Sequence, residues 1–80
     1  MKGAFEMPKK LVITNNIRKL RFFADEMTQL DLAEKAGVSR QTIIALEAGK
    51  YTPSLDMAFR IADVFGVPIS EVFECEAQET

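Results

Sequence analysis

The chain has 80 residues, of which 48% are hydrophobic and 28% are charged. This length and composition predict one small globular domain and leave no room for a second. With one cysteine and no histidine, the chain lacks an intramolecular disulfide, a zinc-ligand cluster and a catalytic Cys-His or Ser-His pair. We therefore expect a protein that is not an enzyme and that needs no cofactor and no metal.

No apolar run approaches the roughly 18 residues that a membrane span needs. The first ten residues also lack the apolar core of a secretory signal. These features predict a cytoplasmic protein that does not associate with membranes.

The formal net charge of −2 argues at first against a nucleic-acid partner, because such proteins usually carry a basic surface. The charges are unevenly distributed, however. Residues 1–24 hold six bases and one acid, a balance of +5, whereas residues 70–80 hold four acids and no base, a balance of −4. The basic block is either an electrostatic footprint for DNA or solvated surface, and solvated surface is the favoured interpretation of the acidic block.

The first residues of the chain show neither helical nor strand periodicity, and they include Gly3 and Pro8, which predicts a flexible arm. The Leu-Val-Ile run at 11–13 is β-prone but too short to stand alone. We expect this run to pack against the first helix or to lie disordered, with a strand paired across a dimer as the alternative. The arm, flexible or a short strand, is assigned to residues 1–14.

The first helix is predicted for about residues 15–25. Cap-type residues stand at 14–16, and apolar residues then recur at the three-to-four spacing of a buried helical face: Ile17, Leu20, Phe23, Ala24 and Met27.

Two short helices should follow. Thr28 is a good helix cap, so we expect a helix over residues 28–36. Gly37 permits a tight turn, and Ser39 caps a second helix over residues 39–48. Two short helices joined by such a turn match the unit that places a recognition helix in the DNA major groove.

Two more helices should complete the domain. One is expected from Leu55 to the residue before Gly66, with Ser54 as its cap and with a buried face formed by Leu55, Ala58, Ile61, Ala62 and Phe65. A last helix over 68–74 should cover the core. The predicted fold class is therefore all-α, a compact five-helix domain over residues 15–74, and residues 75–80 form an acidic C-terminal tail.

Three motifs resemble the lambda-repressor-like, Cro-type helix-turn-helix regulators, also called the xenobiotic-response-element family. They are TQxxLA at 28–33, AGVSRQTIxxLExGK at 36–50 and PSLxxAxxIAxxFGV at 53–67. The segment 21–29 is one residue longer than the commonest family pattern. Alanine stands at position 58 where the family usually has leucine. This second departure is expected to expose Phe59. The residue is then either a dimer contact or an ordinary surface residue, and we favour the dimer contact.

The resemblance implies that the first residues of the recognition helix meet base edges in double-stranded DNA. The corresponding residues here are Ser39, Arg40, Gln41, Thr42 and Ala45. Their chemistry agrees with this role, because arginine fits guanine, glutamine pairs with adenine and alanine contacts the thymine methyl group.

The resemblance also implies contacts that fix the protein on the DNA backbone. Gln29 resembles the family glutamine that contacts phosphate and braces the recognition-helix glutamine, and Thr28, Lys50 and Tyr51 occupy the corresponding helix-end positions. An equally good interpretation is that Thr28 serves only as a helix cap and that Tyr51 serves only as a packing residue. Glu47 resembles the glutamate that pairs with an arginine of the first helix, here Arg21.

The sequence therefore predicts a small, sequence-specific DNA-binding transcriptional regulator that acts as a homodimer without a small-molecule effector. Of the two regulatory outcomes, we favour repression. Two alternatives remain open. One is an antitoxin-type regulator that binds a partner toxin, and the other is a protein-interaction module that has lost DNA binding.

Overall fold

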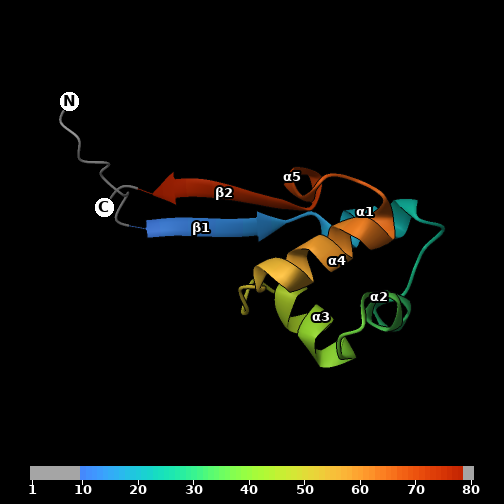
Figure 1. Cartoon of the computed structure of the whole chain (residues 1–80). Coiled ribbons are helices and arrows are strands. Elements are labelled where there is room, and N and C mark those ends of the chain that lie inside the picture. The colour runs from blue at the N-terminus through green and yellow to red at the C-terminus, as the bar shows by residue number, and fades with distance from the viewer. Residues whose placement is uncertain (1–9, 79–80) are drawn as a thin grey trace.

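The computed structural model describes residues 10–78. The elements, in chain order, are β1 (Lys10–Asn15), α1 (Ile17–Phe23), α2 (Gln29–Ala36), α3 (Arg40–Glu47), α4 (Leu55–Phe65), α5 (Ile69–Val72) and β2 (Phe73–Gln78). Figure 1 shows the helices gathered in one body and the two strands side by side, projecting from it. Residues 1–9 of the predicted arm lie outside the described residues, as do residues 79–80.

A single apolar core joins all five helices. Its buried residues are Ile17, Leu32, Ala33, Ala36, Ile43, Leu46, Ile61, Ala62 and Val72. The helical periodicity predicted Ile17, Ile61 and Ala62 among these positions. It was wrong for Phe23 and Leu55, whose side chains are 72% and 70% exposed, because both lie at a helix end where the core no longer covers that side of the helix.

The three predicted helix caps are confirmed. The Thr28 hydroxyl accepts from the Asp31 backbone N–H at 2.9 Å, and the Asp31 carboxylate accepts from the Thr28 N–H at 3.2 Å, which completes a capping box. The hydroxyls of Ser39 and Ser54 cap α3 and α4 by accepting from the backbone N–H groups of Thr42 and Met57, each at 3.1 Å. Each cap satisfies a backbone donor that has no partner within its own helix, and so fixes where the helix begins.

The turn between α2 and α3 depends on Gly37, which has the left-handed backbone conformation, with φ of +75°. A Cβ added to this glycine would lie 3.1 Å from Nη1 of Arg60 on α4. Both the backbone and the space therefore favour glycine here.

Helix α1 is shorter than predicted at both ends. Asn15 belongs to β1, where its side-chain amide donates to the Leu46 carbonyl at 2.8 Å and its side-chain oxygen accepts from the Ile17 N–H at 3.1 Å. At the other end, Asp25 and Glu26 have φ of +61° and +55°, and the Met27 N–H donates back to the Arg21 carbonyl at 2.9 Å. Two successive left-handed residues thus accommodate the longer segment and end the helix early.

The purely all-α prediction was wrong, because β1 and β2 form a two-stranded antiparallel sheet, which we call the ribbon. Ile13 lies opposite Cys75, and Asn15 lies opposite Phe73. The run at 11–13 therefore pairs within its own chain, instead of packing on the first helix or pairing across a dimer. Residues 75–78, expected in the acidic tail, belong to β2.

The last helix is correspondingly shorter than predicted. It ends at Val72, whose carbonyl accepts from the Asn16 N–H at 2.8 Å. From Phe73 onward, apolar and polar residues alternate, which is the period of a half-exposed strand. This bond and this pattern explain why the chain leaves the helix for β2 instead of continuing to residue 74.

Candidate DNA-binding surface

The first turn of α3 presents two polar side chains to solvent. Arg40 and Gln41 are exposed, whereas Thr42 and Ala45 are half-buried. The hydroxyls of Ser39 and Thr42 lie 2.9 Å apart, and the Ser39 oxygen also caps the helix. Arg40 and Gln41 are therefore the residues of this turn that are most free to meet a ligand, while Ser39 and Thr42 fix the helix end from which they project.

The start of α2 lies beside this turn. Thr28 is exposed and Gln29 is half-buried. Because the first N–H groups of a helix have no acceptor within the helix, this end carries a partial positive charge and favours an anion.

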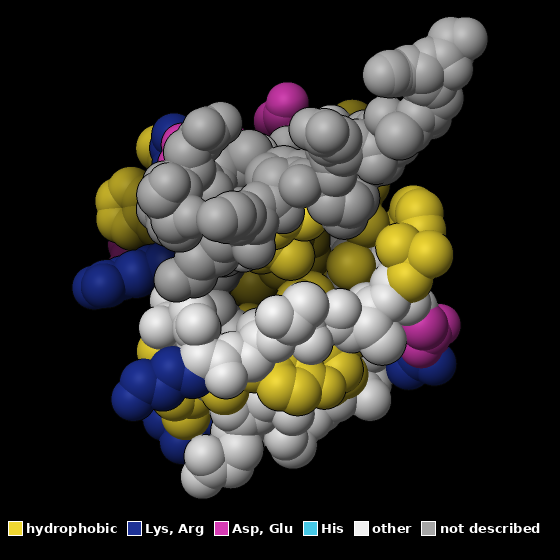
Figure 2. All heavy atoms as spheres, turned by 90° about the vertical axis from the view of Figure 1, so that its left-hand side faces the viewer, with side chains coloured by type: hydrophobic (Ala, Val, Ile, Leu, Met, Phe, Trp, Pro, Cys, Tyr) yellow, Lys and Arg dark blue, Asp and Glu magenta, His cyan; other side chains and the backbone are white. Residues whose placement is uncertain are grey.

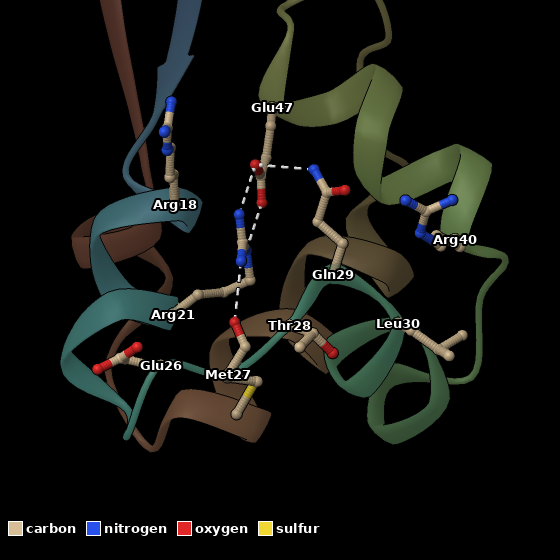
Figure 3. Close-up of a pocket in the computed structure, with 9 residues that line it drawn as sticks. All are labelled: Arg18, Arg21, Glu26, Met27, Thr28, Gln29, Leu30, Arg40 and Glu47. Atoms are coloured by element: carbon tan, nitrogen blue, oxygen red, sulfur yellow. Dashed lines mark hydrogen bonds and ion pairs between the residues drawn. The ribbon is translucent and has the colours of Figure 1, made fainter.

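A polar network holds α1, α2 and α3 in register beneath the surface, as Figure 3 shows. Arg21 donates through two nitrogens to the Glu47 carboxylate, at 2.7 and 3.0 Å, and through a third to the Met27 carbonyl at 2.8 Å. The predicted Arg21–Glu47 pair is confirmed. The two side chains are only 15% and 11% exposed, so most of the pair is shielded from solvent.

Gln29 belongs to the same network, because its amide nitrogen donates to Glu47 at 3.2 Å. The predicted brace between Gln29 and Gln41 is absent from the hydrogen bonds found within residues 10–78. Gln29 therefore connects α2 to the end of α3 through Glu47, and not to the start of α3.

These residues surround an open cleft of about 490 Å³. Its walls include Arg18, Arg21, Thr28, Gln29, Arg40 and Glu47. In Figure 3, Arg18 and Arg40 lie on opposite sides of the Arg21–Glu47–Gln29 network. The fold thus brings Arg40 together with Thr28 and Gln29, as the proposed contacts to one DNA duplex require.

Arg18 is a candidate site residue that the sequence argument missed. It lies three residues before Arg21, and residues at that spacing share one side of a helix. That spacing was the signal in the sequence that pointed to Arg18, because Arg21 was already predicted to lie on the side of α1 that meets Glu47.

The positive charge at the cleft is modest. Three arginines and two glutamates line it, Arg18, Arg21, Arg40, Glu26 and Glu47, which gives a formal balance of +1. Arg21 is neutralised by Glu47, so Arg18 and Arg40 are the cations of the lining that are left for an external anion. Of the bases counted along residues 1–24, Arg18 and Arg21 line the cleft.

Lys50 and Tyr51 are exposed in the loop that follows α3. Neither lines the cleft. They lie at the opposite end of α3 from Arg40, so the expected phosphate contacts flank the recognition helix at both ends.

Two other kinds of site were sought in residues 10–78. No helix in this range is long and apolar enough to cross a membrane. The range also contains no cluster of three or more His, Cys, Asp and Glu side chains able to hold a metal ion.

Comparison with known proteins identifies the fold. The family model described as helix-turn-helix matches residues 17–72. The chain is 56% identical over 63 residues to an uncharacterized HTH-type transcriptional regulator of Methanocaldococcus jannaschii, covering 76% of this chain and 96% of that protein. It is 34% identical over 61 residues to the transcriptional repressor RstR of the cryptic phage CTXphi of Vibrio cholerae, covering 76% of this chain and 54% of RstR.

A solved structure extends the likeness to nearly the whole chain. The transcriptional regulator VanUg superimposes with a TM-score of 0.67 over 98% of this chain and 100% of that one, at 17% identity, a level that shows the fold alone. The family match covers α1 to α5 and includes the capped helix pair that forms the cleft. The chain belongs to the helix-turn-helix family of transcriptional regulators.

Proposed function

We propose that this protein is a sequence-specific repressor that binds double-stranded DNA as a homodimer, with α3 in the major groove. The observation that carries the proposal is the exposed Arg40–Gln41 pair at the capped start of α3, beside a cleft that opens onto the start of α2. A regulator needs such a rigid, solvent-facing helix end, because base edges are read by side chains held in one orientation.

Arg40 and Gln41 are the proposed principal base readers. The arginine fork fits the two acceptors of guanine, and the glutamine amide fits the donor and acceptor of adenine. Thr42 and Ala45, which are half-buried, are close enough to the exposed side of α3 to contribute apolar contact with a thymine methyl group. Ser39 is proposed to act at the groove edge, since its oxygen already serves as the cap.

The backbone contacts are proposed to come from both ends of α3. On the cleft side, Thr28, Gln29 and Arg18 surround the N-terminus of α2, where a phosphate would meet free N–H groups and a cation. On the other side, Lys50 and Tyr51 are exposed and can reach the next phosphates along the groove. Such contacts set the register of α3 without reading sequence.

A dimer is proposed because one α3 covers only a few base pairs. Two copies related by a two-fold axis would read two half-sites about one helical turn apart, which multiplies the discrimination that one helix provides. The similarity to RstR, which is named as a phage repressor, favours repression as the regulatory outcome.

The test is a selection of duplexes from a randomised library at moderate salt by the wild-type chain, Arg40→Ala and Arg60→Ala. Arg60 is an exposed arginine of α4 that does not line the cleft, so it serves as the matched control. We expect Arg40→Ala to lose about 1–3 kcal/mol of specific binding and to relax the preference at one base pair of each half-site. Arg60→Ala should select the same sequence as the wild type. An Arg40→Ala profile identical to that of the wild type would remove Arg40 from the base readers.

A further inference from the structure

Helix α1 carries a second group of side chains, on the side that faces away from the core. Successive residues of a helix are about 100° apart, so four residues fall within an arc of about 140° that lies opposite the buried Ile17: Arg18, Lys19, Phe22 and Phe23. Arg18 lies one turn before Phe22, and Lys19 lies one turn before Phe23. The outer side of α1 therefore presents two parallel rows, each with a cation followed by an aromatic ring.

These four side chains line an open groove of about 590 Å³, which we call the α1 groove. Asn15 and Asn16 complete its lining, at the point where β1 passes into α1. Their amide nitrogens already donate to backbone carbonyls of α3 and α5, at 2.8 and 3.1 Å, and Asn16 also donates to the Glu74 carboxylate at 3.3 Å. The two amides are thus held by the fold, and Arg18 and Lys19 are the charged groups of the lining.

Phe22 and Phe23 form the apolar wall of the α1 groove. They are 63% and 72% exposed. Their ring centroids lie 5.3 Å apart with the planes at 76°. This edge-to-face pair leaves a corner that a side chain can fill, whereas successive stacked bases need ring faces that lie parallel. Two neighbouring exposed aromatic rings mark a site of interaction with another molecule.

The charges around the α1 groove favour an acidic partner. Both charged residues of its described lining are basic, and neither belongs to the ion pairs found within residues 10–78. Residues 25–80, by contrast, carry four bases and eleven acids, a balance of −7. Figure 2 shows Lys and Arg side chains gathered mainly along the left edge of the face that it presents, next to hydrophobic side chains. An acidic segment is attracted to such a basic region and repelled by the acidic remainder of the chain.

We propose that the α1 groove is a docking site for an acidic peptide segment of another protein. Carboxylates of the segment would bind Arg18 and Lys19, and a large apolar side chain between them would fill the corner formed by the two rings. Duplex DNA fits the α1 groove less well, because its phosphates can meet the cations but its base faces are stacked inside the helix and cannot cover the rings.

Arg18 connects this docking site to DNA binding. It lines both the α1 groove and the cleft, so a carboxylate bound to Arg18 removes one of the proposed phosphate contacts. An acidic partner in the α1 groove should therefore weaken the binding of DNA. This consequence rests on the proposed function, whereas the docking itself does not.

The experiment measures the binding of a fluorescent, blocked peptide, in which glutamates flank a central leucine-phenylalanine pair, to the full chain by fluorescence anisotropy. We expect the wild type to bind it, and Phe23→Ala and Lys19→Glu each to bind about tenfold more weakly. The matched controls make the same changes at exposed residues of α4 and α2 that do not line the α1 groove. These controls, Phe59→Ala and Lys35→Glu, should bind like the wild type.

Two altered peptides separate charge from apolar contact. One has glutamine for every glutamate, and the other has serine for both apolar residues. Each should bind at least about tenfold more weakly than the first peptide. A wild type that binds no peptide, an altered peptide that binds as well as the first, or equal losses in the controls would each overturn the proposal.

Other occupants would give different results. An oligothymidylate that binds more tightly than the peptide, and loses affinity in Phe23→Ala, would assign the α1 groove to single-stranded nucleic acid instead. Self-association of the wild type that is lost in Phe23→Ala, measured by sedimentation equilibrium, would assign it to a second copy of this chain. Either result would overturn the acidic peptide as the occupant.

The competition with DNA is measured separately, on a duplex selected by the wild type. The peptide should lower the affinity of the wild type for this duplex and leave that of Phe23→Ala unchanged, because Phe23 lines the α1 groove but not the cleft. A bound peptide that leaves the duplex affinity of the wild type unchanged would refute the competition for Arg18. A chain that binds the peptide and selects no duplex would refute the proposed function alone.

Discussion

Arg18 and Lys19 are neighbours in sequence with different surroundings. Arg18 lines the cleft, whereas Lys19 lies outside it. If Arg18 contacts a phosphate, Arg18→Ala should weaken binding to every duplex about equally and reduce the slope of log affinity against log salt by about one per bound subunit. Lys19→Ala is the matched control and should keep the wild-type slope. Equal slopes for the two variants, measured by fluorescence anisotropy, would exclude Arg18 as a phosphate ligand.

Breaking the Arg21–Glu47 pair is expected to destabilise the domain. Its side chains are mostly buried and hydrogen-bonded, so Glu47→Gln leaves the guanidinium without its counter-ion. We expect a loss of about 3 kcal/mol in the free energy of unfolding, at the low end for a broken buried pair. The double variant Arg21→Met/Glu47→Met, which removes both charges, should lose less. Urea denaturation measures both, and a double variant less stable than Glu47→Gln would contradict this account.

At the scale of elements, the α1–α2 loop holds strain that a substitution can relieve. Asp25 and Glu26 both have positive φ, and a left-handed backbone costs a residue with a Cβ about 1 kcal/mol. Glu26→Gly should therefore raise the free energy of unfolding by about 0.5–1 kcal/mol. Glu26→Ala controls for the lost carboxylate. Thermal unfolding that shows no difference between glycine and alanine at this position would show that the loop is not strained.

The elements differ in how well the sequence predicts them. Helices α2, α3 and α4 begin where Thr28, Ser39 and Ser54 predict, because a cap and its backbone partner lie within three residues of each other. The ribbon depends on pairs such as Ile13 and Cys75, which lie far apart in the chain. The alternation from Phe73 to Gln78 was a usable signal for a strand, but the apolar residues before it also fit a longer helix.

The candidate site shows the same division. The motif around Ser39 predicts that Arg40 and Gln41 lie at an exposed helix end. In the structure both residues are exposed and lie in the first turn of α3. The cleft joins Arg18 to Arg40 across three helices, and only the packing of α1 against α2 and α3 reveals it. Gln29 illustrates the limit of motif reasoning, because its hydrogen bond is to Glu47 and not to Gln41.

At the scale of the whole molecule, the start of α3 and the cleft beside it are proposed to meet DNA. Because each copy would contribute one α3, a dimer gains specificity from both half-sites, while the phosphate contacts of each copy add salt-dependent affinity. Substitutions of the base-reading residues should therefore change the sequence preference, and substitutions of the phosphate-contacting residues should change the salt dependence.

The most direct test of the central claim compares the affinity for a duplex selected from genomic DNA with that for random DNA of the same length, over a range of salt. We expect the selected duplex to bind tighter at every salt concentration. Lys50→Ala should lower the salt slope by about one per bound subunit and weaken both duplexes alike, whereas Gln41→Ala should keep the slope and lose the preference. A wild-type chain that binds no selected duplex more tightly than random DNA would contradict sequence-specific recognition by α3.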